Sequence, residues 1–243
     1  VVAVIGIGVL SYTVPRMSVF SVKRISVEGT SAISDLAVRR TIDPVISHRT
    51  IYTMDASAIR SRLKVFPFVR DVAIHGHFPN GLSIRVTEYQ PLALGVAIGS
   101  GSWLVARDGR VLARVRSADW NGKIPKVVIE SGKLSAGQRL GSEPALNLLR
   151  LVPPTFPGTF ETVEVFTPGR RAKGSSGKFD MLAGTENVIA RMTDGPEIRF
   201  GRPDRLEEKL AVVERLLAIY GPSKRASITY IDVSVPSRPA VMG

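Results

Sequence analysis

The chain has 243 residues with ordinary globular usage, 44% hydrophobic and 22% charged, which excludes a disordered or collagen-like protein and allows one large domain or two small ones. It has no cysteine, so disulfides, thiolate metal sites and cysteine nucleophiles are excluded. Its 33 lysines and arginines against 21 acidic residues give a net charge of +12, which favours anionic partners such as nucleic acid, lipid headgroups or acidic proteins.

The first fourteen residues, VVAVIGIGVLSYTV, contain no charge. They rise about 21 Å as a helix, short of a bilayer core of about 30 Å. Because the sequence starts inside this apolar run, we expect residues 1–18 to be the truncated C-terminal part of a transmembrane helix. A secretory signal core is an alternative, although no A-x-A cleavage site follows. A buried strand is a second alternative. Arg16, Lys23 and Arg24 follow the run and weaken an outward-facing orientation of the remainder.

Residues 19–90 predict a small α/β module with the order β-α-α-β-β. The expected elements are a strand at 19–28, a helix capped by Ser34 and ended by Pro44, a helix at 56–63 capped by Asp55, and strands at 68–75 and 82–88. This order favours two helices on one face of a three-stranded sheet. The expected core is Val27, Leu36, Leu63, Val69, Val72, Leu82, Ile84 and Val86.

Residues 91–243 predict a mostly antiparallel β domain with two helices, so the fold class of the chain is α+β. Asp108-Gly109 indicates a hairpin within 103–115, and Asp194-Gly195 indicates a second one. The remaining expected elements are strands at 126–130, 160–166, 179–182, 187–192 and 197–200, helices at 144–151 and 205–220, and a final strand at 227–235. A Gly/Ser/cationic loop is expected at 170–178.

The sequence offers no recognisable catalytic constellation. His75 and His77 share one face of a strand end, but a zinc site needs a further ligand and none is indicated nearby. No G-x-S-x-G elbow is present, and the glycines at 99–102 lack the lysine of a phosphate-binding loop. The aromatic ladder of single-strand binders is also absent. We therefore expect a non-enzymatic protein with no catalytic, cofactor-binding or metal-binding residue and no small-molecule substrate or nucleic acid partner.

The first module resembles a POTRA domain. The resemblance lies in FSVKRISVEG at 20–29, in Met54-Asp55, and in FPFVRDVAIHGHFPNGLSIRVTEYQPLAL at 66–94. The residues that fill the POTRA pattern are Pro67, Val69, Ala73, Pro79, Leu82, Ile84, Val86, Glu88, Pro91 and Ala93. His75 and His77 stand near the position where arginine is usual.

A single POTRA module after one membrane segment and before a β domain is similar to the FtsQ/DivIB family of cell division proteins. WLVARDGRVL at 103–112, EIRFGRP at 197–203 with Glu208-Lys209-Leu210, and YIDVSVPSRPAV at 230–241 resemble parts of that family's β domain. The resemblance implies a single-pass scaffold of the divisome in the inner cell membrane, with most of the chain extracytoplasmic and enriched at the septum.

The resemblance also implies a partner site on the closing strand, which in the family binds FtsB of the FtsB–FtsL pair. We expect this strand to be a sheet edge that recruits a partner segment by β-augmentation. The candidate partner-binding residues are Tyr230, Ile231, Asp232, Val233, Ser234 and Val235. Further divisome partners are expected on the POTRA module. The alternatives are a POTRA protein of outer-membrane assembly or secretion, and a basic nucleic-acid-binding protein.

Overall fold

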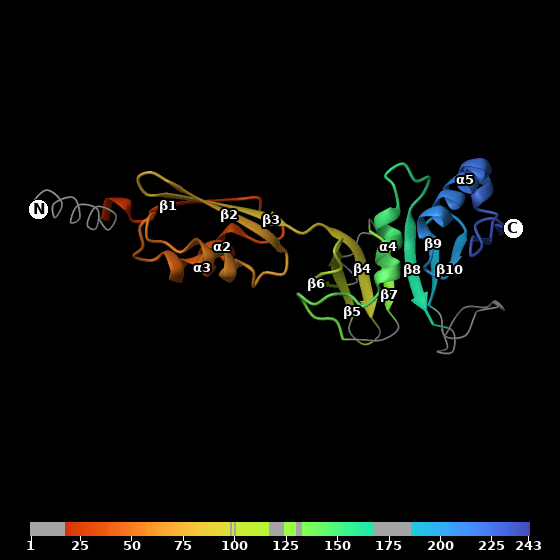
Figure 1. Cartoon of the computed structure of the whole chain (residues 1–243), viewed down its shortest axis with the longest axis horizontal. Helices are drawn as coiled ribbons and strands as arrows, with labels where there is room; N and C mark the ends of the chain where they lie inside the picture. Colours follow the sequence, from red (N-terminus) through yellow and green to blue (C-terminus); the bar gives the residue numbers. More distant parts are fainter. Residues whose placement is uncertain (1–17, 98, 100, 117–123, 130–132, 168–185) are drawn as a thin grey trace, which may run out of the picture. The chain divides into compact units, whose positions relative to one another are not determined.

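The structure is a computed structural model that describes residues 18–97, 99, 101–116, 124–129, 133–167 and 186–243 (Figure 1). The chain divides into two compact units, Val1–Gln90 (unit 1) and Pro91–Gly243 (unit 2). The expected strand at 179–182, the loop at 170–178 and nearly all of the expected membrane segment lie outside the described residues. Within the described ranges, no helix has both the length and the apolarity needed to cross a membrane.

Unit 1 has the predicted β-α-α-β-β order. Its elements are a 3-10 turn η2 (Ser18–Phe20), β1 (Arg24–Glu28), α2 (Asp35–Ile46), α3 (Ala56–Leu63), β2 (Val69–His77) and β3 (Gly81–Glu88). The sheet order is β1-β3-β2, with β1 parallel and β2 antiparallel to the central β3. Both helices lie on one side of this sheet (Figure 1).

The core of unit 1 follows from two periodicities. Alternation along β3 buries Leu82, Ile84 and Val86, as predicted. In α2, a spacing of four residues places a stripe toward the sheet, and its members are Val38, Ile42 and Ile46. The prediction that Leu36 belongs to the core is wrong, because it lies two residues from this stripe and its side chain is exposed.

Two boundaries in unit 1 differ from the prediction. The first strand starts at Arg24, because Ser18–Phe20 forms a 3-10 turn and Ser21 makes only an isolated bridge, to Thr50. The first helix runs past Pro44 to Ile46. Proline fixes its own φ near the helical value, so the last turn continues through Pro44 although this residue has no N–H to donate.

Glu88, at the end of β3, ties this strand to the segment that enters α2. Its carboxylate accepts hydrogen bonds from the Ser31 hydroxyl at 2.6 Å and from the backbone N–H groups of Ser31, Ala32 and Ile33 at 2.9–3.2 Å. Burial raises the pKa of Glu88, whereas these hydrogen bonds lower it, and the net pKa lies below the ordinary value of 4.5. The ionised form is therefore the one that the fold stabilises.

Replacing Glu88 by glutamine should destabilise unit 1 by about 2 kcal/mol near neutral pH, because charge-assisted hydrogen bonds are lost at constant shape. A lowered pKa in the folded state means that this stabilisation is present above the unfolded-state pKa and lost as the pH falls through the folded one. Urea unfolding of wild type and Glu88→Gln should therefore differ at neutral pH and converge in acid. An equal difference at both pH values would contradict this assignment.

The described residues of unit 2 form one nine-stranded sheet with two helices packed against it. Its elements are β4 (Pro91–Ala97), β5 (Gly101–Ala106), β6 (Val111–Val115), β7 (Lys126–Ile129), α4 (Glu143–Leu151), β8 (Phe160–Phe166), β9 (Asn187–Met192), β10 (Glu197–Gly201), α5 (Leu206–Arg225), β11 (Tyr230–Asp232) and β12 (Ala240–Met242). The strand order is β12-β11-β10-β9-β8-β7-β4-β5-β6. Five of the eight neighbouring pairs are antiparallel and three are parallel, so the sheet is mostly antiparallel, as predicted.

The helix α5 holds the C-terminal strands in the core of unit 2. An apolar stripe of this helix faces inward, since Leu206, Leu210, Val213 and Leu217 are all buried. They belong to the same hydrophobic cluster as the inward-facing residues of β10, of β11 and of the position after β11, which are Ile198, Phe200, Ile231 and Val233. Gly221 interrupts the helix with φ 62° and ψ 169°, directly after the predicted end at residue 220.

Candidate partner-binding site

The segment 227–235, expected to be one long strand, is shorter and turns early. β11 spans only Tyr230–Asp232. Ile231 and Val233 point into the core, whereas Tyr230 and Asp232 are half-buried on the opposite face. Ser234 and Val235 are exposed, because the chain leaves the sheet after Val233. Val235 therefore does not share the buried face of Ile231 and Val233.

The expectation that this strand is the edge of the sheet is also wrong. β11 pairs in parallel with β10 on one side and antiparallel with β12 on the other. β12 has β11 on one side and no strand on its other side among the residues that the structure describes. The edge therefore belongs to β12, a three-residue strand that no sequence pattern predicts.

The hydrogen bonds of β11 show which way its backbone points. Val233 N donates to Arg199 O at 2.9 Å, and Glu197 N donates to Thr229 O at 3.1 Å. Odd-numbered residues of this strand therefore turn their backbone groups toward β10. Ser234 N donates to its neighbour's carboxylate, Asp232 Oδ1, at 2.8 Å. Proline at 233 or 234 would remove an internal bond rather than probe an edge.

Backbone N–H and C=O groups alternate between the two sides of a strand, so one residue of β12 points its backbone groups away from β11. Tyr230 and Asp232 turn their backbone groups toward β12, where they pair with Met242 and Ala240. Val241, between these two, consequently directs its N–H and C=O away from β11. The only sequence signal for this strand is the short apolar run PAVMG after a proline-rich turn, which is too short for a periodicity argument.

The outer face of these strands combines aromatic, apolar and charged groups. The guanidinium of Arg199 lies 3.7 Å from the centre of the Tyr230 ring, and its Nε bonds Glu197 at 2.8 Å. Met242 pairs directly with Tyr230, shares its face and is 52% exposed. A partner strand added to β12 would therefore meet an exposed methionine and, beyond it, a tyrosine held in place by arginine.

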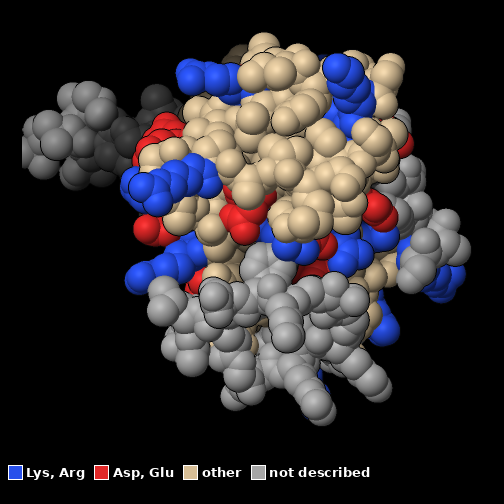
Figure 2. Space-filling model, turned by 90° about the vertical axis from the view of Figure 1, so that its right-hand side faces the viewer, with Lys and Arg blue, Asp and Glu red and all other residues tan. Residues whose placement is uncertain are grey.

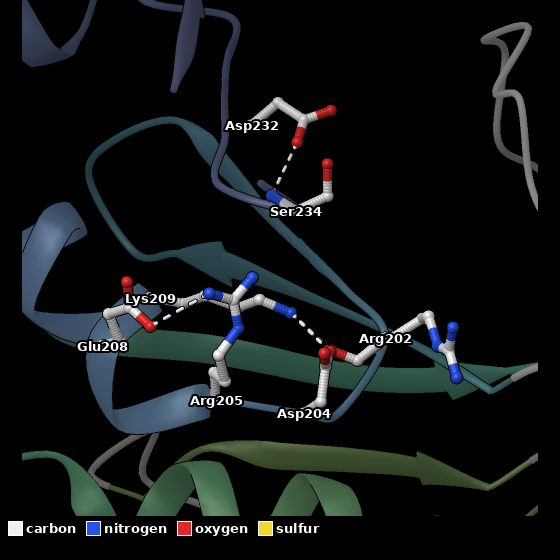
Figure 3. A network of polar contacts seen from close by, with 7 residues as sticks. All are labelled: Arg202, Asp204, Arg205, Glu208, Lys209, Asp232 and Ser234. Carbon is white, nitrogen blue, oxygen red and sulfur yellow. Dashed lines mark hydrogen bonds and ion pairs between the residues drawn. The ribbon is translucent and has the colours of Figure 1, made fainter. Parts of the chain in front are cut away.

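A buried lysine fixes the loop between β10 and α5. Lys209 is in the first turns of α5, and its side chain is only 1% exposed. Its Nζ donates to Arg202 O at 2.7 Å and to Asp204 Oδ1 at 2.9 Å (Figure 3). The hydrogen bond from Lys209 is the largest cause that holds the pKa of Asp204 below its ordinary value; burial raises that pKa, and the charges of Lys209 and Arg202 lower it. The loop is thereby held as a fixed support for the end of β10.

Gly201 brings this loop against the segment that follows β11. Gly201 has φ 64°, and a Cβ built on it would lie 2.7 Å from Ser234 Cβ. A side chain at 201 therefore collides with the turn that leads from β11 to β12. Glycine is required here both for the positive φ and for the close approach.

The surface at this end of unit 2 is poor in charge over a broad area. Figure 2 shows this area as a continuous uncharged region in the upper half of the view, with lysine, arginine and acidic residues at its border. Exposed apolar side chains in the C-terminal part of unit 2 are Ile219, Val235 and Met242. Depletion of charge with apolar groups at the centre is the composition of protein–protein interfaces.

No cluster of three or more His, Asp or Glu side chains that could hold a metal occurs in the described part of the chain. His75 and His77 lie at the end of β2, and both are exposed.

Comparison with known families matches both units. Residues 20–89 match the model of the FtsQ-type POTRA domain, and residues 96–234 match that of the C-terminal domain of the cell division protein FtsQ/DivIB. The second match covers more than half of the chain. A single POTRA module joined to this β domain defines the class, and the chain belongs to the FtsQ/DivIB family of cell division proteins.

Individual relatives agree with this membership. The chain is 24% identical to the cell division protein FtsQ of Streptomyces venezuelae over 92% of its own length and 75% of that protein. It is 35% identical to the cell division protein DivIB of Macrococcus caseolyticus over 32% of this chain and 26% of the relative. It is also 27% identical to FtsQ of Myxococcus fulvus, over 44% of this chain and 36% of that protein.

Proposed function

We propose that this protein is a non-enzymatic scaffold of the bacterial cell division machinery that recruits partner proteins through the β12 edge of unit 2. The observation that carries the proposal is the free side of Val241 in β12, in a chain of a cell division family. An exposed strand edge binds an extended segment through main-chain hydrogen bonds.

The other edge of the sheet, β6, is a weaker candidate. Val111 N donates to Gln138 O at 2.8 Å, and Gly137 N donates to Val111 O at 2.7 Å. A neighbouring segment therefore already occupies backbone groups at the start of β6. β12 has no comparable cover among the described residues.

The partner proposed for β12 is an extended segment of the FtsB–FtsL pair. The residues 230–235 then act from beside the docked strand rather than by pairing with it. Tyr230 and Asp232 present side chains on the outer face, Ile231 and Val233 fix β11 in the core, and the exposed Ser234 and Val235 form the adjacent turn.

Anchoring in the inner membrane with both units outside the cytoplasm is part of the same proposal. Its support is the composition of residues 1–14. This segment has no charged side chain that would have to be buried in the bilayer core. Enrichment at the septum follows from binding to division partners, and further partners are proposed for unit 1.

The test is Val241→Pro. Proline removes the outward N–H of β12, and its ring obstructs an added strand, whereas the inward ladder to β11 is kept. Loss of one net hydrogen bond of about 1 kcal/mol together with the steric clash should weaken binding to the cognate FtsB–FtsL pair by about tenfold or more. Calorimetric titration measures the affinity, and a thermal melt shows that unit 2 stays folded.

Two controls make the result specific to the register. Val241→Ala keeps the N–H and should change the affinity only slightly. Met242→Pro removes an N–H that points toward β11 and should loosen β12 itself. Full affinity of a folded Val241→Pro variant would exclude β12 as the docking edge.

A further inference from the structure

Unit 1 carries a group of three aromatic rings, two of them exposed, beside the segment where the described chain begins. The ring of Phe20 lies 5.5 Å from that of Tyr52 and 5.8 Å from that of Phe78, measured between centroids. Tyr52 is 59% exposed and Phe78 is 75% exposed, and the neighbouring Val19 is exposed as well. We refer to Val19, Phe20, Tyr52 and Phe78 as the aromatic patch.

The backbone holds the segments of the aromatic patch together. Ile51 N donates to Phe20 O at 3.0 Å, and Lys23 N donates to Asn80 O at 3.0 Å. The patch is therefore a built surface formed by η2, the loop after α2 and the turn between β2 and β3. Figure 1 shows η2 and this turn at the same end of unit 1.

A basic hollow of about 560 Å³ adjoins the aromatic patch. Phe78 and His77 form part of its wall, and its cationic groups come from Lys23, Arg24 and Arg39; no carboxylate lines it. Arg39 is fixed there by a hydrogen bond from its Nη2 to Ile25 O at 2.5 Å. Lys23 and Arg24 are exposed, so their charges are available to a ligand in the hollow.

Aromatic rings beside cations have a known place in membrane proteins. Tyrosine and other aromatic side chains lie at the level of the lipid headgroups, and lysine and arginine attract anionic lipids within a Debye length of the surface. The patch follows within a few residues of the uncharged segment 1–14, which places it near the point of entry into a bilayer if that segment spans one.

We propose that the aromatic patch and the basic hollow form a membrane-interface site, in which the hollow takes the phosphate of an anionic lipid headgroup and the rings enter the headgroup layer. This inference rests on the proposed membrane anchoring. The proposed site adds a second membrane contact to that anchor, and this contact fixes the orientation of unit 1 on the bilayer. The charges of the hollow favour a lipid phosphate over an uncharged protein surface as its occupant.

The chain has no cysteine, which permits a clean site-specific probe. The full chain is reconstituted into vesicles of phosphatidylcholine, with or without phosphatidylglycerol, after labelling Phe78→Cys with a polarity-sensitive fluorophore. The fluorophore replaces one aromatic group by another. In anionic vesicles its emission should shift to the blue, and nitroxide lipids should quench it. A probe on Thr87→Cys, exposed near the other end of β3, should show neither effect.

Charge variants separate docking from simple tethering. Each cation near an anionic surface changes the ratio of docked to undocked unit 1 by about fivefold, so Lys23→Gln with Arg24→Gln should lower it by about 25-fold. Lys64→Gln with Arg70→Gln removes the same two residue types from exposed positions outside the hollow and should leave the ratio unchanged.

Three other results would overturn the proposal in distinguishable ways. If the chain floats with the vesicles but the probe at 78 behaves alike in both lipids and in the double variant, the anchor stands and the site does not. If the probe at 78 is quenched only after a division protein is added, the patch is a protein interface. If the chain does not float with any vesicle, both the anchor and the site are wrong.

Discussion

Replacing Ile84 by aspartate should abolish folding of unit 1. Ile84 is 0% exposed and lies in the central strand β3, directly paired with Val27 of β1 and Ile74 of β2. A carboxylate there has no cation within the core cluster to pair with. Burying it costs several kcal/mol, comparable with the whole stability of a small domain, about 5–15 kcal/mol.

Hydrogen exchange on the full chain measures this result unit by unit. Amides of β2 and β3 should lose their protection in Ile84→Asp, whereas those of β8 and β9 in unit 2 should keep theirs. Thr87→Asp places the same side chain on the exposed face of the same strand and should keep unit 1 folded. Unchanged protection of β3 in Ile84→Asp would mean that the face assignment of this strand is wrong.

Much of unit 1 can be predicted because its signals are local. The alternation in β3 needs only the residues 82–88 themselves, and the caps at Ser34 and Asp55 act on N–H groups two or three residues away. The prediction for Leu36 is wrong because its position depends on which stripe of α2 meets the sheet. That choice is made by the packing of α2 against the sheet and α3, which no local pattern contains.

The candidate site is harder to predict because edge status depends on distant pairing. The segment YIDVSV predicts a strand but does not indicate which strands pair with it. β12 is identified only from the pairing of residues 240–242 with 230–232 in the structure. β4 escapes prediction for a related reason. PLALGVA has consecutive buried residues, so it lacks the alternation of a half-exposed strand.

The support beneath the site is equally hidden. Lys209 follows two exposed glutamates in α5, and its sequence position suggests a solvated side chain. It is buried because two oxygen acceptors in the preceding loop receive its ammonium group. The segment EIRFGRP at 197–203 and the triplet Glu208-Lys209-Leu210 contain Gly201 and Lys209, but the sequence alone does not explain either residue. In the structure, Gly201 allows the close approach to Ser234, and Lys209 holds the β10–α5 loop.

Replacing Gly201 by alanine should destabilise unit 2 by about 3 kcal/mol. The residue sits at an irregularity in the β9–β10 ladder with φ 64°, where a side chain adds about 1–2 kcal/mol of backbone strain. The new Cβ would also lie 2.7 Å from Ser234 Cβ, and overpacking of this kind costs about 1–3 kcal/mol. Because Ser234 lies between β11 and β12, the clash should also displace the strand that carries the proposed edge.

Two further variants divide this loss into its parts. Gly99 has φ 81° and nothing within 4 Å of the position that an added Cβ would occupy, so Gly99→Ala should show the strain without the clash. Adding Ser234→Gly to Gly201→Ala removes the colliding atom while keeping the backbone bond from residue 234 to Asp232. This double variant should recover about 1–2 kcal/mol in urea unfolding. If it recovers nothing, the contact between Gly201 and Ser234 does not couple the β10–α5 loop to the edge of the sheet.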